Sequence, residues 1–369
     1  MSIVKDRVKK VSSLFDELSL DLIVVVGEAN LEYFTGIDSG LMLIISRSMD
    51  ATLIVPRLDF QRAQNIVGDH VNLIGYSTIE MPRRMPEERL FISKSLGDYL
   101  LREVGLKPNN IVGIDNPDSP VAKELSSVGV KIININDSIL KLREIKDEYE
   151  VRMIEEATRI TEEALDSVLK SGLEGRRERD VAAMLYQEMI SKGAEDVAFK
   201  PIVASGPNGA YPHHVFTDRV IGRGELVTID VGARYHLYCT DMTRTVAVGS
   251  VSGKLKDATL AVLEAFRKAS SSVRPGVKAR DVDSIARNVL AEYGFDVYYI
   301  HSTGHGVGIE VHERPSIGPS SDEELLPNEV ITVEPGVYIK GVGGVRIEDT
   351  ILVTETGSRP ISRYPADLF

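Results

Sequence analysis

The amino-acid sequence predicts an α/β domain over residues 1–136, followed by an α+β domain over residues 137–369. Three observations support this prediction. Helix-like and strand-like patterns alternate through roughly the first 140 residues, which is typical of a mixed sheet with helices around it. A break at Asn136-Asp137 precedes a long, charged helical pattern, and the rest of the chain repeats one helix-and-hairpin pattern. A chain of 369 residues is long enough for two separate cores.

We expect the N-terminal domain to consist of short apolar strands between amphipathic helices. The expected strands are 22–26, 41–46, 52–56 and 111–114, and the expected helices are 4–18 and 91–104. Gly105 would end the second helix, because glycine commonly follows the last helical turn. The sequence of this domain holds no cluster of His, Asp and Glu, so we expect no chemistry in it.

The C-terminal domain begins with a charged helix over residues 147–170, in which Glu and Lys or Arg are spaced for i,i+4 pairing. Gly172 ends this helix. Residues 172–199 then resemble residues 274–299, since Arg179-Asp180-Val181 aligns with Arg280-Asp281-Val282 and Gly193 with Gly294. Each copy precedes a pair of acidic strands. The duplication predicts two halves related by a pseudo-two-fold axis, which would bring the acidic groups together.

Two predicted β-hairpins carry two carboxylates each within apolar, strand-like runs. Asp230 and Asp241 lie on the first hairpin, and Glu334 and Glu348 lie on the second. A lone Asp in a strand is usually a turn or edge residue, and a lone His such as His305 is usually a satisfied core or surface group. Buried carboxylates without partners are costly, however, so the whole set indicates a metal centre. Four negative charges exceed what one divalent ion neutralises, which favours two bridged ions.

The composition excludes several classes of function. Acidic residues outnumber basic ones by 55 to 43, which argues against a surface that binds nucleic acid or an anionic membrane. No apolar run approaches the roughly 20 residues of a membrane-spanning helix, and the charged N-terminal pattern is not that of a signal peptide. The single Cys239 cannot form an internal disulfide, which favours the cytoplasm. We expect Cys239 to be a small buried apolar residue rather than a soft metal ligand.

Several motifs resemble those of the metal-dependent Xaa-Pro peptidases, which are the Xaa-Pro dipeptidases (prolidases) and Xaa-Pro aminopeptidases. The C-terminal motifs are Asp230, Asp241 with Thr243-Arg244-Thr245, GHGVGIEVHE, VEPGVYI and GGVRIED. Residues 30–36, NLEYFTG, resemble the N-terminal domain that this family shares with creatinase, and residues 205–213 resemble its first active-site histidine segment. The resemblance covers nearly the whole chain. It implies a creatinase-like α/β domain followed by a catalytic domain with the pita-bread fold.

The resemblance also implies a set of metal ligands. Asp230 would hold one ion with both carboxylate oxygens, His305 and Glu334 would hold the other, and Asp241 and Glu348 would bridge the pair. Oxygen and nitrogen ligands without thiolates suit Mn²⁺, Co²⁺, Zn²⁺ or Fe²⁺. A water activated by two Lewis acids would be the nucleophile.

Four residues match catalytic positions of the family. Glu334 would pass a proton to the leaving nitrogen of proline, and His213 and His312 would stabilise the substrate carbonyl and the tetrahedral intermediate. Arg346 would orient the bridging carboxylate and support proton relay, a role compatible with that of a simple ion pair. His301 lies in the same motif as His305 and is expected to support the site without touching the metal.

The short two-domain chain resembles microbial prolidases, so we expect cleavage of Xaa-Pro dipeptides with an apolar first residue. Two departures leave an Xaa-Pro aminopeptidase open as the alternative. His214 stands where many relatives have glycine, and Arg314 precedes Pro315, whereas in several prolidase-type relatives an arginine after the proline binds the dipeptide carboxylate. A non-catalytic peptide-binding module is a remoter alternative, because all five ligand positions are retained. Relatives form dimers, so a homodimer is expected.

Overall fold

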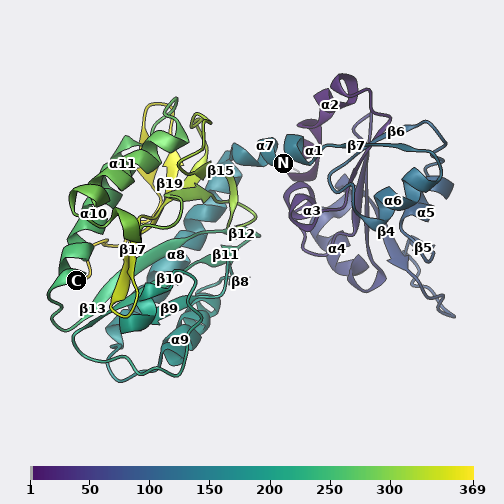
Figure 1. Cartoon of the computed structure of the whole chain (residues 1–369). Helices are drawn as coiled ribbons and strands as arrows, with labels where there is room; N and C mark the ends of the chain where they lie inside the picture. The colour runs from purple at the N-terminus through teal and green to yellow at the C-terminus, as the bar shows by residue number, and fades with distance from the viewer. Residues whose placement is uncertain (1–2) are drawn as a thin grey trace. The chain divides into compact units, whose positions relative to one another are not determined.

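The computed structural model describes residues 3–369, and contacts divide the chain between Arg143 and Glu144 into two compact units (Figure 1). The boundary predicted from sequence, after residue 136, lies at the start of the last helix of the first unit, α7 (Asn136–Glu144). Among the described residues, none of the helices has the length and apolar character needed to cross a membrane.

The N-terminal unit is built on a seven-stranded sheet with the order β5-β4-β3-β2-β1-β6-β7. Its strands are β1 (Leu22–Val25), β2 (Met42–Ser46), β3 (Ala51–Pro56), β4 (Asn72–Ser77), β5 (Leu90–Ile92), β6 (Ile111–Ile114) and β7 (Lys131–Asn134). Strand β2 is antiparallel to β1 and β3, and the other neighbours are parallel. The sheet is therefore mixed, as predicted. Its central strands are continuous apolar runs, as expected of strands buried on both faces.

Helices surround this sheet. They are α1 (Ile3–Lys9), α2 (Ser12–Glu17), α3 (Glu28–Thr35), α4 (Phe60–Val67), α5 (Gly97–Arg102), α6 (Pro120–Ser127) and α7. The expected helix 4–18 is split into α1 and α2. The expected helix 91–104 was wrong at its start, because Phe91 pairs with Tyr76 in the sheet and its ring packs on Tyr99, with centroids 5.1 Å apart. Sheet pairing here overrides a locally helical pattern.

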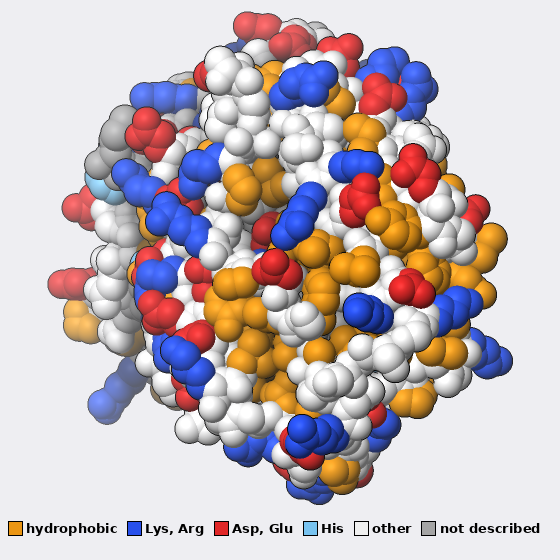
Figure 2. Space-filling model, turned by 90° about the vertical axis from the view of Figure 1, so that its left-hand side faces the viewer, with side chains coloured by type: hydrophobic (Ala, Val, Ile, Leu, Met, Phe, Trp, Pro, Cys, Tyr) orange, Lys and Arg blue, Asp and Glu red, His pale blue; other side chains and the backbone are white. Residues whose placement is uncertain are grey.

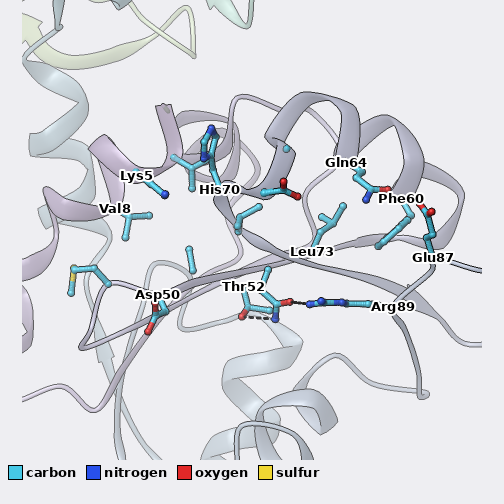
Figure 3. Close-up of a pocket in the computed structure, with 17 residues that line it drawn as sticks. Lys5, Val8, Asp50, Thr52, Phe60, Gln64, His70, Leu73, Glu87 and Arg89 are labelled. Carbon is cyan, nitrogen blue, oxygen red and sulfur yellow. Dashed lines mark hydrogen bonds between the residues drawn. The ribbon is translucent and has the colours of Figure 1, made fainter. Parts of the chain in front are cut away.

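A hollow of about 820 Å³ lies in the N-terminal unit among α1, α4 and strands β3 and β4 (Figure 3). Its lining is of mixed character and includes Val8, Phe60, Asp50 and His70. Three polar residues of the lining bond to one another, since Arg89 donates to Asn72 Oδ1 at 2.7 Å and Asn72 Nδ2 donates to Thr52 Oγ1 at 3.2 Å.

The C-terminal unit contains two halves of the same construction. The elements of the first are α8 (Glu148–Lys170), α9 (Glu178–Ser191), β8 (Asp196–Val197), β9 (Ile202–Ser205), β10 (Glu225–Val231), β11 (Ala233–Tyr235), β12 (Tyr238–Cys239) and β13 (Met242–Val248). Those of the second are α10 (Lys254–Ser272), α11 (Ala279–Glu292), β14 (Gly304–Gly306), β15 (Glu313–Ile317), β16 (Val330–Val333), β17 (Gly336–Ile339), β18 (Gly343–Arg346), β19 (Asp349–Val353) and β20 (Ser358–Pro360). Short 3₁₀ helices are η1 (Arg57–Asp59) and η2 (Gly68–His70) in the N-terminal unit, and η3 (Gly206–Ala210) and η4 (Asp296–Tyr298) in the C-terminal unit.

In each half, a pair of helices packs on three antiparallel strands in the same chain order. Helices α8 and α9 cover the sheet β13-β10-β9, and α10 and α11 cover the strands that include β14-β16-β19. Helix α8 begins with a capping box formed by Asp147 and Glu150, and Gly172 follows it with a φ of 80°. This arrangement agrees with the internal duplication predicted from sequence.

On the face of the molecule shown in Figure 2, basic and acidic side chains are interspersed among hydrophobic ones.

Candidate metal centre

The four predicted acidic ligands occupy corresponding places in the two halves. Asp230 lies at the end of the middle strand β10, and Glu334 directly follows the matching strand β16. Asp241 directly precedes β13, and Glu348 directly precedes the matching strand β19. The structural repeat therefore supplies two carboxylates from each half.

Hydrogen bonds between β13 and β19 bring the two halves together at the site. The Glu348 amide donates to the Thr243 carbonyl at 3.1 Å, and the Asp241 amide donates to Thr350 Oγ1 at 3.3 Å. Thr350 Oγ1 in turn donates to the Asp241 carbonyl at 2.8 Å. Because these bonds join the residues next to the ligands, the side chains of Asp241 and Glu348 are held side by side.

The second hairpin differs from the expected one because its two strands change from one sheet to another at the two carboxylates. Strands β16 and β19 pair within a five-stranded sheet, whereas their continuations β17 and β18 pair in a separate two-stranded sheet. Glu334 and Glu348 lie at the break between these sheets, outside the ladders themselves. Where a strand passes from one sheet to another, the regular alternation of side chains is interrupted. A residue at that point can direct its side chain differently, as happens at a β-bulge.

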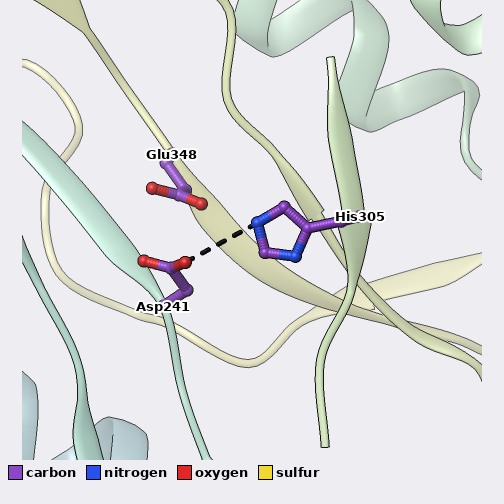
Figure 4. A group of neighbouring side chains, drawn as sticks. All are labelled: Asp241, His305 and Glu348. Carbon is purple, nitrogen blue, oxygen red and sulfur yellow. Dashed lines mark ion pairs between the residues drawn. The ribbon is translucent and has the colours of Figure 1, made fainter. Parts of the chain in front are cut away.

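His305 completes the group from β14 (Figure 4). Its Nε2 atom lies 3.3 Å from Glu334 Oε1 and 3.7 Å from Asp241 Oδ2. Its Nδ1 atom lies 3.0 Å from the Gly306 carbonyl, so Nδ1 carries the proton and Nε2 is left to bind. Ligand atoms of Asp241, His305 and Glu348 all lie within 4.8 Å of one another, which makes this group a possible metal site among the described residues.

The glycines on either side of His305 are required by the sheet. A Cβ atom at Gly304 would collide with the backbone of Thr332, and one at Gly306 with the backbone of Arg314. Strand β14 is thus held closely between its neighbours β16 and β15. This close packing fixes where the imidazole of His305 can lie.

The electrostatics of the group fit a bound cation. Burial first, and then the neighbouring carboxylates, raise the pKa of Asp241 and of Glu348 well above the ordinary value. One oxygen each of Asp230, Asp241 and Glu348 is buried and has no hydrogen-bond partner. Unpaired buried carboxylate oxygens are expensive, and a divalent ion would satisfy them. The residues present therefore fit the metal that their chemistry implies.

Arg346 hydrogen-bonds one of the predicted ligands directly and is connected to a second through Thr243. Its Nη2 atom donates to Asp230 Oδ2 at 2.6 Å, which leaves only Asp230 Oδ1 without a partner. The family resemblance predicts that Arg346 orients a bridging carboxylate. It reaches Glu348 only through Thr243, whose Oγ1 lies 3.1 Å from Arg346 Nε and donates to Glu348 Oε2 at 2.6 Å.

Tyr338 links Arg346 to His301. The Tyr338 hydroxyl accepts from Arg346 Nη1 at 2.8 Å and lies 2.9 Å from His301 Nε2. His301 thus contacts Tyr338, and its supporting role stays a prediction. Sequence reasoning assigned no role to Thr243 or Tyr338, yet strand register could have found them. Thr243 lies opposite Asp230, and Tyr338 lies diagonally across its hairpin from Arg346, so each shares a face with its partner.

His312, the last histidine of the motif that carries His305, lies beside His305. The rings of His305 and His312 are 4.4 Å apart between centroids. Burial first, and then His305 and His213 among others, lower the pKa of His312. Pro212, next to His213, accepts from Arg346 Nη1 through its carbonyl at 3.4 Å. His214 is turned elsewhere, and its Nε2 lies 2.9 Å from Glu178 Oε2.

Comparison with known proteins assigns the fold. Residues 152–355 match the model of metallopeptidase family M24, and residues 7–145 match the creatinase/prolidase N-terminal domain. The chain belongs to metallopeptidase family M24. The predicted order, a creatinase-like domain followed by a pita-bread catalytic domain, is confirmed. Cys239 is buried on β12, as expected of a small apolar residue.

Relatives with solved structures or curated names cover essentially the whole chain. An Xaa-Pro dipeptidase of Pyrococcus horikoshii is 38% identical over 379 residues, covering 100% of each protein. The structure of a prolidase from Pyrococcus furiosus is 37% identical, with a TM-score of 0.83, and covers 96% of this chain and 99% of that one. An X-Pro aminopeptidase from Thermotoga maritima is 30% identical, with a TM-score of 0.85, and covers 98% and 99%. This M24 protein is a hydrolase, and its family implies a divalent metal.

Proposed function

We propose that this M24 protein is a dinuclear-metal Xaa-Pro dipeptidase. The observation that carries the proposal is the cluster of four carboxylates around His305, three of which have a buried oxygen without a hydrogen-bond partner. The relatives named Xaa-Pro dipeptidase and prolidase supply the substrate class. Proline restricts the residue before it and lacks an amide hydrogen, so its peptide bond calls for a dedicated site.

Five residues would hold the metal. Asp230 would bind one ion, His305 and Glu334 would bind the other, and Asp241 and Glu348 would be shared between them. The short distances from His305 Nε2 to Glu334 and Asp241 support this assignment. Two divalent ions would balance the four carboxylates, whereas one would leave net negative charge in a buried site. Mn²⁺, Co²⁺, Zn²⁺ and Fe²⁺ all suit such oxygen and nitrogen ligands.

The side chains around the ions divide the work of hydrolysis. Divalent ions held there would acidify water and polarise the scissile carbonyl. Glu334 would take a proton at its carboxylate and return it to the proline nitrogen. His312 and His213 would donate to the oxygen that gains negative charge. Arg346 would orient Asp230 through its 2.6 Å hydrogen bond.

The experiment that tests this function compares two substrates that differ only beyond proline. We expect the metal-loaded protein to hydrolyse Met-Pro with a higher kcat/KM than Met-Pro-Ala-Ala, under both Mn²⁺ and Co²⁺. A hydrogen bond to the free carboxylate of the dipeptide contributes roughly 1.5–3 kcal/mol, which corresponds to about ten-fold or more in kcat/KM. Equal rates, or faster cleavage of the tetrapeptide, would refute the dipeptidase assignment.

One observation favours the aminopeptidase alternative. The two candidates for binding the dipeptide carboxylate are both engaged, since His214 bonds Glu178 and Arg314 Nη2 donates to Glu323 Oε1 at 2.9 Å. If no other cation serves that carboxylate, peptides longer than two residues will be accepted. The same pair of substrates distinguishes the two activities.

A peptide-binding module without catalysis is the remaining alternative. Metal analysis of the purified protein separates it from an enzyme. We expect about two divalent ions per chain and activation by added Mn²⁺ or Co²⁺. Fewer than about one ion, with no activation, would favour the binding module.

Assembly and location extend the proposal. We infer that the protein is a homodimer in the cytoplasm, as the family resemblance and the single Cys239 suggest. Light scattering at micromolar concentration is expected to give the mass of two chains, and the mass of one chain would contradict the dimer.

A further inference from the structure

Glu178 is the most heavily bonded carboxylate outside the metal centre among the described contacts. It is the first residue of α9, and it is fully buried. Its Oε1 atom accepts from the Ser205 amide at 2.9 Å, from Ser205 Oγ at 2.7 Å and from Asn208 Nδ2 at 2.9 Å. Its Oε2 atom accepts from the Thr217 amide at 2.9 Å and from Thr217 Oγ1 at 2.7 Å, and it lies 2.9 Å from His214 Nε2.

These donors come from one segment, residues 205–217, and they stand on both sides of His213. Ser205 ends β9 and Asn208 lies in η3, whereas His214 and Thr217 follow His213. One carboxylate therefore holds both ends of the segment that carries His213. Burial opposes ionisation of Glu178, but the hydrogen bonds from His214, Ser205, Thr217 and Asn208 outweigh it and lower its pKa to about 2. The carboxylate is thus charged at any pH at which the protein works.

The same segment is fixed to the metal centre on its other side. Gly209 and Gly344 approach so closely that a side chain on either would collide with the backbone of the other. This contact sets η3 against β18, the strand that carries Arg346. The Pro212 carbonyl accepts from Arg346 Nη1 at 3.4 Å. His213 therefore lies in the chain directly between Pro212, which contacts Arg346, and His214, which contacts Glu178.

The second half of the catalytic unit contains a counterpart. Asp283 on α11 is fully buried and accepts from the Thr303 amide at 3.1 Å and from Thr303 Oγ1 at 2.9 Å. Thr303 leads directly into Gly304 and His305. Each half thus uses one buried carboxylate, from its second helix, to hold a backbone amide and a hydroxyl at the entry to a site histidine. In the alignment of the two halves Asp283 corresponds to Ala182 rather than to Glu178, so the two halves make the same kind of contact from different positions of the second helix.

We propose that Glu178 is a positioning residue for the peptidase reaction, which holds the 205–217 segment so that His213 points at the substrate carbonyl. The proposal rests on the proposed function of His213. It also assigns His214 to this support, because its Nε2 lies 2.9 Å from Glu178 Oε2. None of the hydrogen bonds described for Glu178 involves a proposed metal ligand, so we assign its effect to the segment that it holds.

An amide cannot replace this carboxylate. In Glu178→Gln, one of the two oxygens becomes an NH₂ group. In the wild-type protein, each oxygen accepts a hydrogen bond from one backbone amide, Oε1 from Ser205 and Oε2 from Thr217. A backbone N–H can only donate, so neither contact can be reversed. Whichever way the amide lies, one end of the segment faces a donor instead of an acceptor. The substitution therefore releases one end of the segment while it preserves the size of the side chain.

A double-mutant cycle with His213→Ala tests the proposal. With Met-Pro as substrate, we expect Glu178→Gln to lower kcat about ten-fold or more, with KM and metal content unchanged. In the His213→Ala background, the same change should lower kcat less than about two-fold, because the group that it positions is absent. Additive losses in the cycle, or full kcat in His213→Ala, would overturn the proposal.

Matched controls separate positioning from general loss of structure. Glu178→Asp keeps both acceptors and should retain more kcat than Glu178→Gln. Glu162→Gln removes a carboxylate that accepts from the backbone amide of Tyr364 at 2.9 Å, and this variant should keep full kcat.

Hydrogen exchange of the purified full chain gives a readout that needs no activity. In Glu178→Gln, amide exchange in residues 205–217 should rise while residues 301–306 stay protected, and Asp283→Asn should show the reverse. Unchanged exchange at 205–217 would overturn the proposal even if the protein cleaves Xaa-Pro bonds. If the wild-type protein hydrolyses no Xaa-Pro peptide, the proposed function fails, and the exchange result alone still decides whether Glu178 holds the segment.

Discussion

Arg346 and Asp230 are joined by a hydrogen bond of 2.6 Å between Nη2 and Oδ2, and both side chains are nearly buried. Because one carboxylate oxygen is used by the guanidinium, only Oδ1 of Asp230 is left without a protein partner. The same guanidinium contacts Thr243 and Tyr338, so one side chain orients ligands from both halves of the repeat. These side chains and Glu348, which accepts from Thr243, therefore form one hydrogen-bonded unit.

Replacement of Arg346 by Lys should show how much this unit contributes. A lysine carries the charge but cannot reproduce the fork of the guanidinium, so it can serve Asp230 or Tyr338 but not both. We expect a loss of about 10–100-fold in activity or metal affinity. Metal titration and steady-state kinetics measure the two effects. Arg359→Lys, which changes a half-exposed pair with Glu155, is the matched control and should leave both unchanged.

The two carboxylates proposed to bridge the ions should be indispensable. Asp241→Asn or Glu348→Gln removes one negative charge and one shared ligand, so each should abolish turnover and release most of the metal. Elemental analysis after gel filtration, together with Met-Pro hydrolysis, checks both effects. Near-normal turnover in either variant would refute the dinuclear assignment.

His312 should act on the reaction rather than on the metal. Its ring packs on His305, but its proposed partner is the substrate oxygen. His312→Ala should lower kcat by about 10² or more and leave the metal content intact, as expected when transition-state stabilisation is lost. Loss of metal in this variant would instead place His312 among the ligands.

The glycine after His305 should tolerate no side chain. In Gly306→Ala, the new methyl group would meet the backbone of Arg314, and we expect a loss of about 1–3 kcal/mol or more in the free energy of unfolding. Gly357→Ala is the matched control, since a Cβ atom there meets nothing within 4 Å, and its effect should stay within about 0.5 kcal/mol. Urea denaturation measures both, and equal stabilities would show that β14 can move aside.

Glu329 should make the stability of the metal-free protein depend on pH. Burial, opposed by the Leu326 amide and reinforced by Glu144, raises its pKa from 4.5 to about 7. The folded state then binds the proton more tightly than the unfolded state, so the free energy of unfolding falls as the pH rises from about 4.5 to about 7. The full effect is up to about 3 kcal/mol.

Comparison of urea denaturation at pH 5 and pH 8 isolates this contribution. Glu329→Gln cannot ionise, so the variant should gain stability relative to the wild type at pH 8 and differ little at pH 5. An equal effect at both values of pH would show that Glu329 does not titrate in this range.

The arrangement of the catalytic unit was largely predictable from the sequence, because a repeat leaves its signature in local spacing. Two helices, a glycine and an acidic strand pair recur in both halves, and the structure forms them with the strand order of the repeat. The mixed sheet of the first unit was also predicted correctly, because its apolar runs match buried strands. The prediction of a helix over 91–104 was wrong at its start, where residues Leu90–Ile92 form strand β5. Only the pairing with β4 makes this segment a strand.

The sequence by itself determined the family, the fold class and the residue types that could bind a metal, because these depend on motifs and hydrophobic period. The tertiary structure alone decided which atoms meet. Arg346 bonds Asp230 across 116 residues, and His214 meets Glu178 across 36, so no local pattern could reveal either pairing. A buried charge takes its role from whichever distant donors surround it, and these are set only when segments far apart in the sequence pack together.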